Sequence, residues 1–348
     1  MAQDVWQQSL KDSITRVDQL ADYFEFDQRQ LATVEARYPM RISPYYLSLI
    51  EQVDDPIWKQ CVPDVRELDD SGFSDPLAED DFSPTPAVIH RYPDRVIFLV
   101  SGSCASYCRF CTRKRKVGCA NMSLSFRELR DGIDYIAADP QIRDVIFSGG
   151  DPLLLPDSVL LDLLARVSAI PHVEIIRIGT RVPVTLPERI TERLCAMLKK
   201  FQPLYLNTHF NHPRELTQQA SEACARLADA GIVLGNQTVL LRGVNDQPDT
   251  ISDLFRGLLK MRVRPYYLHH MDLTRGTNHF RTSVKSGLQI MFSLRGPVSG
   301  LASPHYIIDL PDGKGKVPLV PQYVKKRGDV LLIHAADGSV VEYPDVLD

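Results

Sequence analysis

The sequence lacks long apolar runs and an excess of charge of either sign. No stretch approaches the ~20 consecutive apolar residues of a membrane-spanning helix, and the N-terminus mixes acidic and basic residues without the apolar core of a signal peptide. Its 40 Lys and Arg against 44 Asp and Glu leave a formal net charge of -4, unlike the basic character of a nucleic-acid coat. We therefore expect a cytoplasmic protein whose partners include neither membranes nor nucleic acids.

Cysteine is also scarce, and its placement is uneven. The 7 cysteines form an odd number in a chain without a secretion signal, so no disulfide framework is expected. Cys104, Cys108 and Cys111 nevertheless lie close together, which random placement would seldom produce. The remaining cysteines have no partner at a useful spacing: Cys61, Cys119, Cys195 and Cys224. Cys195 and Cys224 fall in predicted helices and are interpreted as small core residues.

What the chain does contain is a regular alternation of strand-length and helix-length segments. Short apolar, β-branched runs predict strands at 95–100, 144–149, 173–180, 204–210, 232–240 and 264–270. Amphipathic segments between and after them predict helices near 125–138, 157–169, 186–200, 214–230, 249–261 and 282–294. Repeated βαβ units indicate an α/β fold with a parallel sheet and right-handed crossovers. Such a sheet can curl into a barrel or lie open.

Polar residues collect where these predicted strands end, and in either arrangement the reactive groups gather at that edge. They are Ser148 to Asp151, Thr180 and Arg181, Thr208 and His209, Asn236 and Gln237, and His269 to Asp272. Residues 1–90 form a predicted helical leader, and from about residue 304 the pattern changes to strands, a glycine-rich loop and a hairpin. The site is therefore expected at the carboxyl ends of the strands.

The cysteine cluster directly follows the first predicted strand. Three thiolates on one loop can hold three irons of a 4Fe-4S cluster and leave the fourth iron open to a small molecule. A zinc knuckle is the alternative, but zinc normally takes four ligands from two separated pairs, and no second cysteine pair exists here. The spacing therefore favours an open cluster bound by Cys104, Cys108 and Cys111.

This C-x-x-x-C-x-x-C pattern, with Phe110 just before its last cysteine, resembles the radical S-adenosylmethionine (SAM) superfamily. The resemblance implies that the open iron chelates SAM, which electron transfer cleaves to a 5′-deoxyadenosyl radical. The run Ser148-Gly149-Gly150-Asp151 resembles the glycine-rich motif that contacts the methionine amino group. Taken alone, a G-G-D sequence is usually just a turn.

Residues from about 40 to 335 resemble the lysine 2,3-aminomutase family more narrowly, through HRYPDRV, CTRKR, SGGDPLL, LNTHFNHP, RVRPYYLHHMDL and GKGKVP. The resemblance implies a partial (βα)6 radical-SAM barrel at 91–300, preceded by the N-terminal helical extension 1–90. A C-terminal strand and hairpin segment, 301–348, carries a lysine for a second cofactor, pyridoxal 5′-phosphate (PLP).

The resemblance assigns the PLP Schiff-base lysine to Lys316, in a loop whose glycines let backbone and cofactor approach closely. Lys314 departs from the all-glycine loop of the family and is kept as a lesser candidate. Arg91 and Arg95 resemble the phosphate-side residues, and a guanidinium can hold phosphate oxygens with paired hydrogen bonds. Without the resemblance, each would be interpreted as a solvated surface charge.

Substrate residues follow from the same resemblance. Arg113 matches the carboxylate clamp, while Asp272 and Asp309 resemble the two ligands of the distal ammonium of lysine. Two anions beside a buried cation offset its desolvation. A glutamate substrate would instead need a cation there. His209 and Gln237 resemble contacts to SAM, although each could equally have a hydrogen-bonded structural role.

We therefore expect an isomerase that interconverts L-lysine and β-lysine by 2,3-amino migration. We also expect an electron donor such as flavodoxin or ferredoxin, and assembly as a homo-oligomer. Three alternatives stay open. The first is an enzyme of the same mechanism that acts on arginine or glutamate, or that supplies β-lysine for elongation factor P. The second is a radical enzyme that modifies RNA or protein without PLP. The third is a non-catalytic iron-sulfur or zinc-binding module. The basic run Arg113 to Lys116 could also be a nucleic-acid patch.

Overall fold

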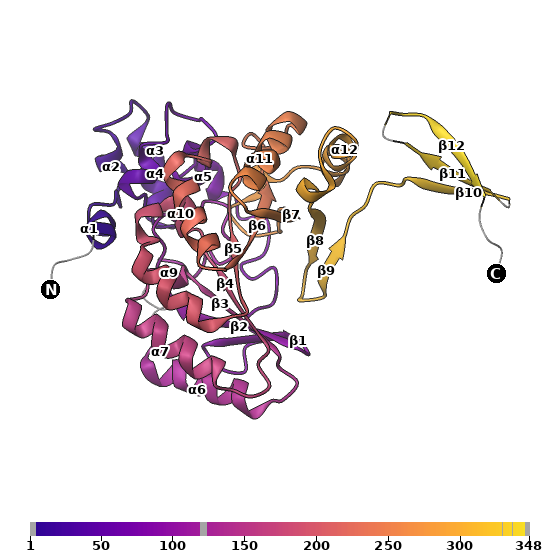
Figure 1. The fold of residues 1–348 in the computed structure, drawn as a ribbon. Helices are drawn as coiled ribbons and strands as arrows, with labels where there is room; N and C mark the ends of the chain where they lie inside the picture. Colours follow the sequence, from indigo (N-terminus) through magenta and orange to yellow (C-terminus); the bar gives the residue numbers. More distant parts are fainter. Residues whose placement is uncertain (1–4, 119–123, 329, 336, 345–348) are drawn as a thin grey trace.

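A computed structural model describes residues 5–118, 124–328, 330–335 and 337–344, so Cys119 lies outside the described residues. Its main feature is a 9-stranded sheet in which every strand neighbours the next one in sequence (Figure 1). The strands are β1 (Val88–Tyr92), β2 (Arg95–Ser101), β3 (Asp144–Gly149), β4 (Ile175–Gly179), β5 (Leu204–Thr208), β6 (Val233–Leu240), β7 (Arg264–His270), β8 (His305–Leu310) and β9 (Gly315–Pro318). The predicted strands are thus present, most with bounds shifted by a few residues.

Strands β2 to β8 run parallel, and β1 and β9 add antiparallel edges. Because β1 and β9 end the strand order, the sheet curls without closing. This confirms the expected α/β partial barrel and decides between the barrel and the open layer. The parallel array also continues into β8, so the C-terminal segment contributes to the barrel sheet itself.

Helices cover the outside of the sheet (Figure 1). They are α6 (Phe126–Ala138), α7 (Asp157–Ser168), α9 (Glu192–Leu198), α10 (Gln218–Asp229), α11 (Pro248–Lys260) and α12 (Val284–Leu294). The short helix α8 (Val182–Thr185) follows β4 and is buried. The helix predicted at 186–200 is broken, because Pro187 opens a 3-10 turn and the Thr191 side chain caps a new helix by accepting from Leu194 N–H. The helix predicted from 214 likewise begins later, where Thr217 caps α10.

The N-terminal extension forms short helices that pack on the barrel and share its core. They are α1 (Val5–Lys11), α2 (Val17–Leu20), α3 (Gln28–Glu35), α4 (Pro44–Leu47) and α5 (Trp58–Cys61). Trp6, Leu20 and Trp58 are buried in the same hydrophobic cluster as Leu206 of β5. The extension is therefore built into the domain and can position residues of the site.

Alternate residues of the parallel strands face opposite sides of the sheet. In β6, Leu234, Asn236 and Thr238 are buried, whereas Gly235 and Gln237 between them are partly exposed. The fully buried side chains pack under the helices, so the partly exposed set lines the barrel interior. This alternation places Gln237 on the interior face.

A separate 3-stranded sheet follows, made of β10 (Val324–Arg327), β11 (Val330–His334) and β12 (Val340–Pro344). Figure 1 shows it standing apart from the barrel, and its described residues are exposed or partly exposed. None of the helices in the described ranges is both long and apolar enough to cross a bilayer.

Candidate active site

The loop that carries Cys104, Cys108 and Cys111 follows β2 and is held by the N-terminal extension. Tyr107 N–H donates to the Arg41 carbonyl at 2.9 Å, and Arg109 N–H donates to the Gln60 carbonyl at 2.9 Å. Arg109 itself, between two of the cysteines, is one of the largest fully buried side chains. The extension therefore determines the shape of the cysteine loop.

A buried carboxylate explains how two cations can lie beneath this loop. Glu67 accepts from Arg109 Nε at 2.9 Å and also pairs with the Lys114 ammonium. Lys114 donates as well to the carbonyls of Arg109 and Gly276. Burial lowers the pKa of Lys114 to about 8, whereas the two cations hold the pKa of Glu67 below its usual range against the effect of burial.

The thiols themselves fit a metal cluster. Burial and neighbouring anionic groups raise the pKa of Cys111 to about 11 and that of Cys104 well above its usual value. Bound iron would supply the positive charge that stabilises their thiolates. Within the part of the chain that the structure describes, no three His, Cys, Asp or Glu side chains converge on a single ion. A 4Fe-4S cluster needs no such convergence, because each thiolate binds a different iron.

The glycine motif ends β3 beside the same loop. Gly149 has φ +125°, and a Cβ at Gly150 would lie 2.4 Å from the Ser103 carbonyl oxygen, so only glycine fits against this backbone. The Asp151 carboxylate points into the protein, where it accepts from Thr180 Oγ1 at 2.6 Å and from Arg181 N–H at 2.7 Å. Its contacts therefore support the turn that presents the glycines.

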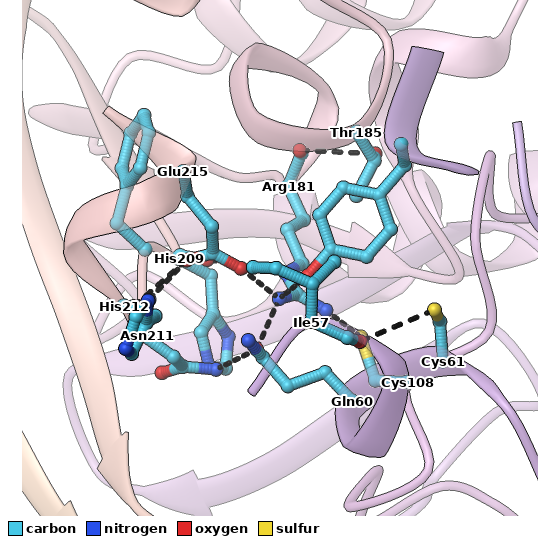
Figure 2. Close-up of polar contacts among 12 residues, drawn as sticks. Ile57, Gln60, Cys61, Cys108, Arg181, Thr185, His209, Asn211, His212 and Glu215 are labelled. Atoms are coloured by element: carbon cyan, nitrogen blue, oxygen red, sulfur yellow. Dashed lines mark hydrogen bonds and ion pairs between the residues drawn. The ribbon is translucent and has the colours of Figure 1, made fainter. Parts of the chain in front are cut away.

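Arg181 and His209 follow the ends of β4 and β5, whereas Gln237, expected at a strand end, lies within the neighbouring strand β6. Figure 2 shows Arg181 reaching from the end of β4 towards Cys108, with His209 beside it. The ring of His209 lies 5.5 Å from that of Phe110, and burial with the charge of Arg181 lowers the pKa of His209 far below its usual value. Its Nε2 is buried without a hydrogen-bond partner among the described residues. A neutral imidazole nitrogen is thus free for a ligand beside the cysteine loop.

The β8–β9 hairpin brings together two residues that are separated in sequence. Asp309 and Lys316 are cross-strand partners, and their side chains form an ion pair. Asp309 is almost fully buried and also pairs with Arg91 at 3.1 Å. Lys314 lies in the turn with its side chain 71% exposed, 3.9 Å from Asp312. Of the two candidate lysines, only Lys316 therefore contacts the other predicted site residues.

Tyr92 connects the two predicted phosphate-side arginines to this hairpin. The guanidinium groups of Arg91 and Arg95 lie 4.9 and 4.8 Å from the centre of its ring. Its hydroxyl oxygen accepts from the Lys316 N–H at 3.1 Å. Arg95 is otherwise 42% exposed beside Asp94.

Asp272 follows β7 and lies under the influence of Asp309 and Lys316. Burial, with the negative charge of Asp309, raises the pKa of Asp272 to about 7. Its Oδ1 is buried and accepts no hydrogen bond from any described residue. Burial and the Lys316 ammonium lower the pKa of nearby His269 to about 3. Two carboxylates and one lysine therefore share one electrostatic environment.

Arg113 is held by Glu79, through Nε at 2.9 Å and Nη2 at 2.7 Å, while Nη1 donates to Ser148 Oγ at 3.3 Å. The paired contact leaves the Nη1 side directed towards the glycine motif. The other basic residues of this run also have acidic partners. They are Lys114 with Glu67, Arg115 with Asp75 and Asp80, and Lys116 with Asp80. The run is therefore neutralised within the fold, which argues against a nucleic-acid patch.

Sequence reasoning missed several residues around these groups. Tyr92 stands between the two arginines of HRYPDR, so that motif itself contained the signal. Glu67 and Glu79 come from the acidic N-terminal region, and nothing in their spacing indicated which cations they would meet. The sequence indicates Arg181 only as one of several polar residues at strand ends.

The chain is similar to known proteins along nearly its whole length. Residues 98–255 match the Radical SAM superfamily, and residues 291–346 match the family described as Lysine-2,3-aminomutase. The L-lysine 2,3-aminomutase of Fusobacterium nucleatum is 48% identical over 327 residues, covering 92% of this chain and 77% of the relative. That of Methanococcus maripaludis is 47% identical, covering 99% and 81%.

A glutamate 2,3-aminomutase of Clostridioides difficile is 44% identical, covering 98% of this chain and 82% of the relative. Identity alone thus does not separate the two substrates. With such identities over nearly the whole chain, the protein belongs to the lysine 2,3-aminomutase family of the radical SAM superfamily.

Proposed function

We propose that this protein interconverts L-lysine and β-lysine by moving an amino group between C2 and C3. The observation that carries the proposal is the pair of carboxylates, Asp272 and Asp309, beside Lys316 in a chain that also carries the three-cysteine loop. When bound, the 4Fe-4S cluster with SAM supplies a radical that removes a hydrogen atom, and PLP stabilises an unpaired electron next to its ring.

We assign the cluster to Cys104, Cys108 and Cys111. The backbone of Ser148, Gly149 and Gly150 would bind the methionine amino group of SAM, since the glycines let this turn pack closely against Ser101 and Ser103 at the start of the cysteine loop. Two polar side chains of neighbouring strands would contact the rest of SAM: His209 through its unpartnered Nε2 and Gln237 from the interior face of β6. Asp151 would act indirectly, by holding the turn.

For PLP, we assign Lys316 as the residue that binds it covalently, with Arg91 and Arg95 holding its phosphate. Tyr92 would fix the positions of these arginines and of the Lys316 backbone relative to one another, because it contacts all three. Asp309 neutralises both Lys316 and Arg91 and so compensates the positive charge of the pocket. These residues orient the reacting carbon atoms and exclude water.

The substrate would be recognised by charge at both ends. Arg113, oriented by Glu79, would hold the α-carboxylate, and Asp272 with Asp309 would hold the distal ammonium. A buried ammonium needs anionic partners to offset its lost hydration, and Asp272 has an unused buried oxygen. The side-chain carboxylate of glutamate would meet like charge at this position, which favours lysine over glutamate.

Reduction of the cluster requires an external electron donor, which we propose to be a flavodoxin or ferredoxin. We also propose a cytoplasmic location, because reduced thiols and an oxygen-sensitive cluster suit a reducing compartment. We further propose that the protein assembles as a homo-oligomer.

The test is anaerobic incubation of the purified protein with both cofactors, a strong reductant and, separately, lysine, arginine or glutamate, followed by amino-acid analysis. We expect β-lysine from lysine and no product from glutamate. Turnover of glutamate alone would contradict the roles of Asp272 and Asp309.

The covalent site is tested by borohydride reduction of the PLP-loaded protein and peptide mapping. Lys316 should carry the label, and Lys316→Ala should abolish it, whereas Lys314→Ala is the matched control from the same hairpin and should keep it. Labelling of neither lysine would favour a radical enzyme that works without PLP.

A further inference from the structure

Arg181 contacts a clustered cysteine through a guanidinium group that no role proposed above uses. Its Nη1 lies 2.8 Å from Sγ of Cys108, and Figure 2 shows this contact between the end of β4 and the cysteine loop. We propose that Arg181 is a positioning residue that donates a hydrogen bond to the Cys108 sulfur and thereby raises the reduction potential of the cluster. The inference rests on the proposed function, because it presupposes that this loop binds the cluster.

The guanidinium is fixed by partners on its other nitrogens. Nη2 donates to Gln60 Oε1 at 2.6 Å, to Glu215 Oε1 at 2.8 Å and to the Tyr46 hydroxyl at 3.0 Å, while Nε donates to the His209 carbonyl at 3.1 Å. These partners come from the N-terminal extension and from the segment after β5. A side chain held from so many directions keeps its Nη1 directed at the sulfur.

The backbone of Arg181 and one face of its guanidinium group also have partners. Asp151 accepts from the Arg181 N–H and from Thr180 Oγ1, which ties the start of this residue to the glycine motif. The ring of Phe110, the aromatic residue of the cysteine motif, lies 5.3 Å from the guanidinium carbon. The same motif that supplies the thiols therefore also supplies a face for the cation.

The sign of the effect follows from charge. Reduction adds one electron, so a fixed cation beside a ligating sulfur stabilises the reduced cluster more than the oxidised cluster. Glu215, whose side chain is fully buried, partly neutralises Arg181 and accepts further bonds from the N–H groups of Asn211 and His212. Loss of Arg181 should therefore lower the potential, and loss of the charge of Glu215 should raise it.

The experiment is a redox titration of the anaerobically purified protein, followed by electron paramagnetic resonance, after iron and sulfide analysis. At a fixed potential, Arg181→Gln should lower the ratio of reduced to oxidised cluster about tenfold, which is ~59 mV for a one-electron couple. Arg181→Lys keeps the charge and should shift the ratio less. Glu215→Gln should shift it in the opposite direction.

Arg189→Gln is the matched control, because Arg189 is also fully buried and paired, with Asp157 and the Leu153 carbonyl. It should reduce thermal stability without moving the potential. Absence of a cluster in the unsubstituted protein would reject the proposed function itself. A full cluster with unchanged potential in Arg181→Gln, or shifts of the same sign in Arg181→Gln and Glu215→Gln, would overturn the inference. Should Arg181→Gln not fold, Arg181→Lys and Glu215→Gln decide it by the signs of their shifts.

Discussion

Buried charges are paired differently in two parts of the site. We call the surroundings of the three clustered cysteines the cysteine end, and the surroundings of Asp272, Asp309 and Lys316 the lysine end. Around the cysteine loop, cations meet carboxylates inside the protein: Arg109 and Lys114 meet Glu67, and Arg181 meets Glu215. Around Lys316, the Asp272 carboxylate has a buried oxygen without a partner among the described residues, and its pKa is raised to about 7.

This difference indicates how ligand binding changes the structure and the stability of each end. The cysteine end is preorganised, so binding a cluster there requires little rearrangement of its surroundings. At the lysine end, the Asp272 carboxylate has a buried oxygen to which no described residue donates, which costs stability in the protein free of substrate. A cationic ligand would remove that cost, as expected where function and stability compete.

Replacing a clustered cysteine should have the largest effect. Cys108→Ser removes one iron ligand, so we expect turnover of lysine to fall by at least about a thousandfold, on the order of 4 kcal/mol. Iron content and amino-acid analysis measure it. Cys224→Ser, a buried thiol of α10 in the hydrophobic core, is the control and should keep its iron. Full turnover by Cys108→Ser would contradict the assignment of Cys108 as an iron ligand.

Glu67→Gln should mainly affect stability. It leaves Arg109 and Lys114 buried without their counter-charge, for which we expect a loss of about 3 kcal/mol in the free energy of unfolding. Denaturant unfolding of the same anaerobic preparation measures it. The control is Asp229→Asn, whose partner Arg262 is half exposed; it should cost less than about 0.5 kcal/mol. Equal losses in the free energy of unfolding of the two variants would show that the buried charges under the cysteine loop stabilise the protein no more than an exposed ion pair does.

Much of the fold could be predicted because strands and helices depend on local patterns. Short apolar, β-branched runs located β6 and β7, and the helix predicted near 125–138 is α6, which the Ser125 side chain caps. The cysteine motif was recognisable for the same reason, since its ligands are close in sequence.

The surrounding charges could not be predicted, because their partners meet only in the folded chain. Glu67 reaches Arg109 and Lys114 from the N-terminal extension, and the Arg181 guanidinium meets Cys108 from the end of β4. No spacing in the sequence encodes such contacts. The pair Asp309 and Lys316 is the exception, because one hairpin brings them together.

Asp272→Asn should have opposite effects on function and on stability. Losing the anion should raise KM for lysine by about tenfold to a hundredfold, as for a charged hydrogen bond of about 1.5–3 kcal/mol. Removing an uncompensated buried charge should stabilise the empty protein by about 1 kcal/mol. Steady-state kinetics and thermal unfolding measure the two effects. Destabilisation together with unchanged KM would contradict the assignment of Asp272 to the lysine end.

The raised pKa of Asp272 also predicts two opposite pH dependences in the protein free of substrate. Only the carboxylate binds an ammonium, so kcat/KM for lysine should fall by up to about tenfold per pH unit below about pH 7. The folded state binds the proton more tightly than the unfolded state, so this group's contribution to stability should be lost as pH rises from about 4 to 7. Both dependences should be absent from Asp272→Asn and should therefore appear in the difference between the unsubstituted protein and this variant. A kcat/KM profile that is the same in both proteins would assign the titration to another group.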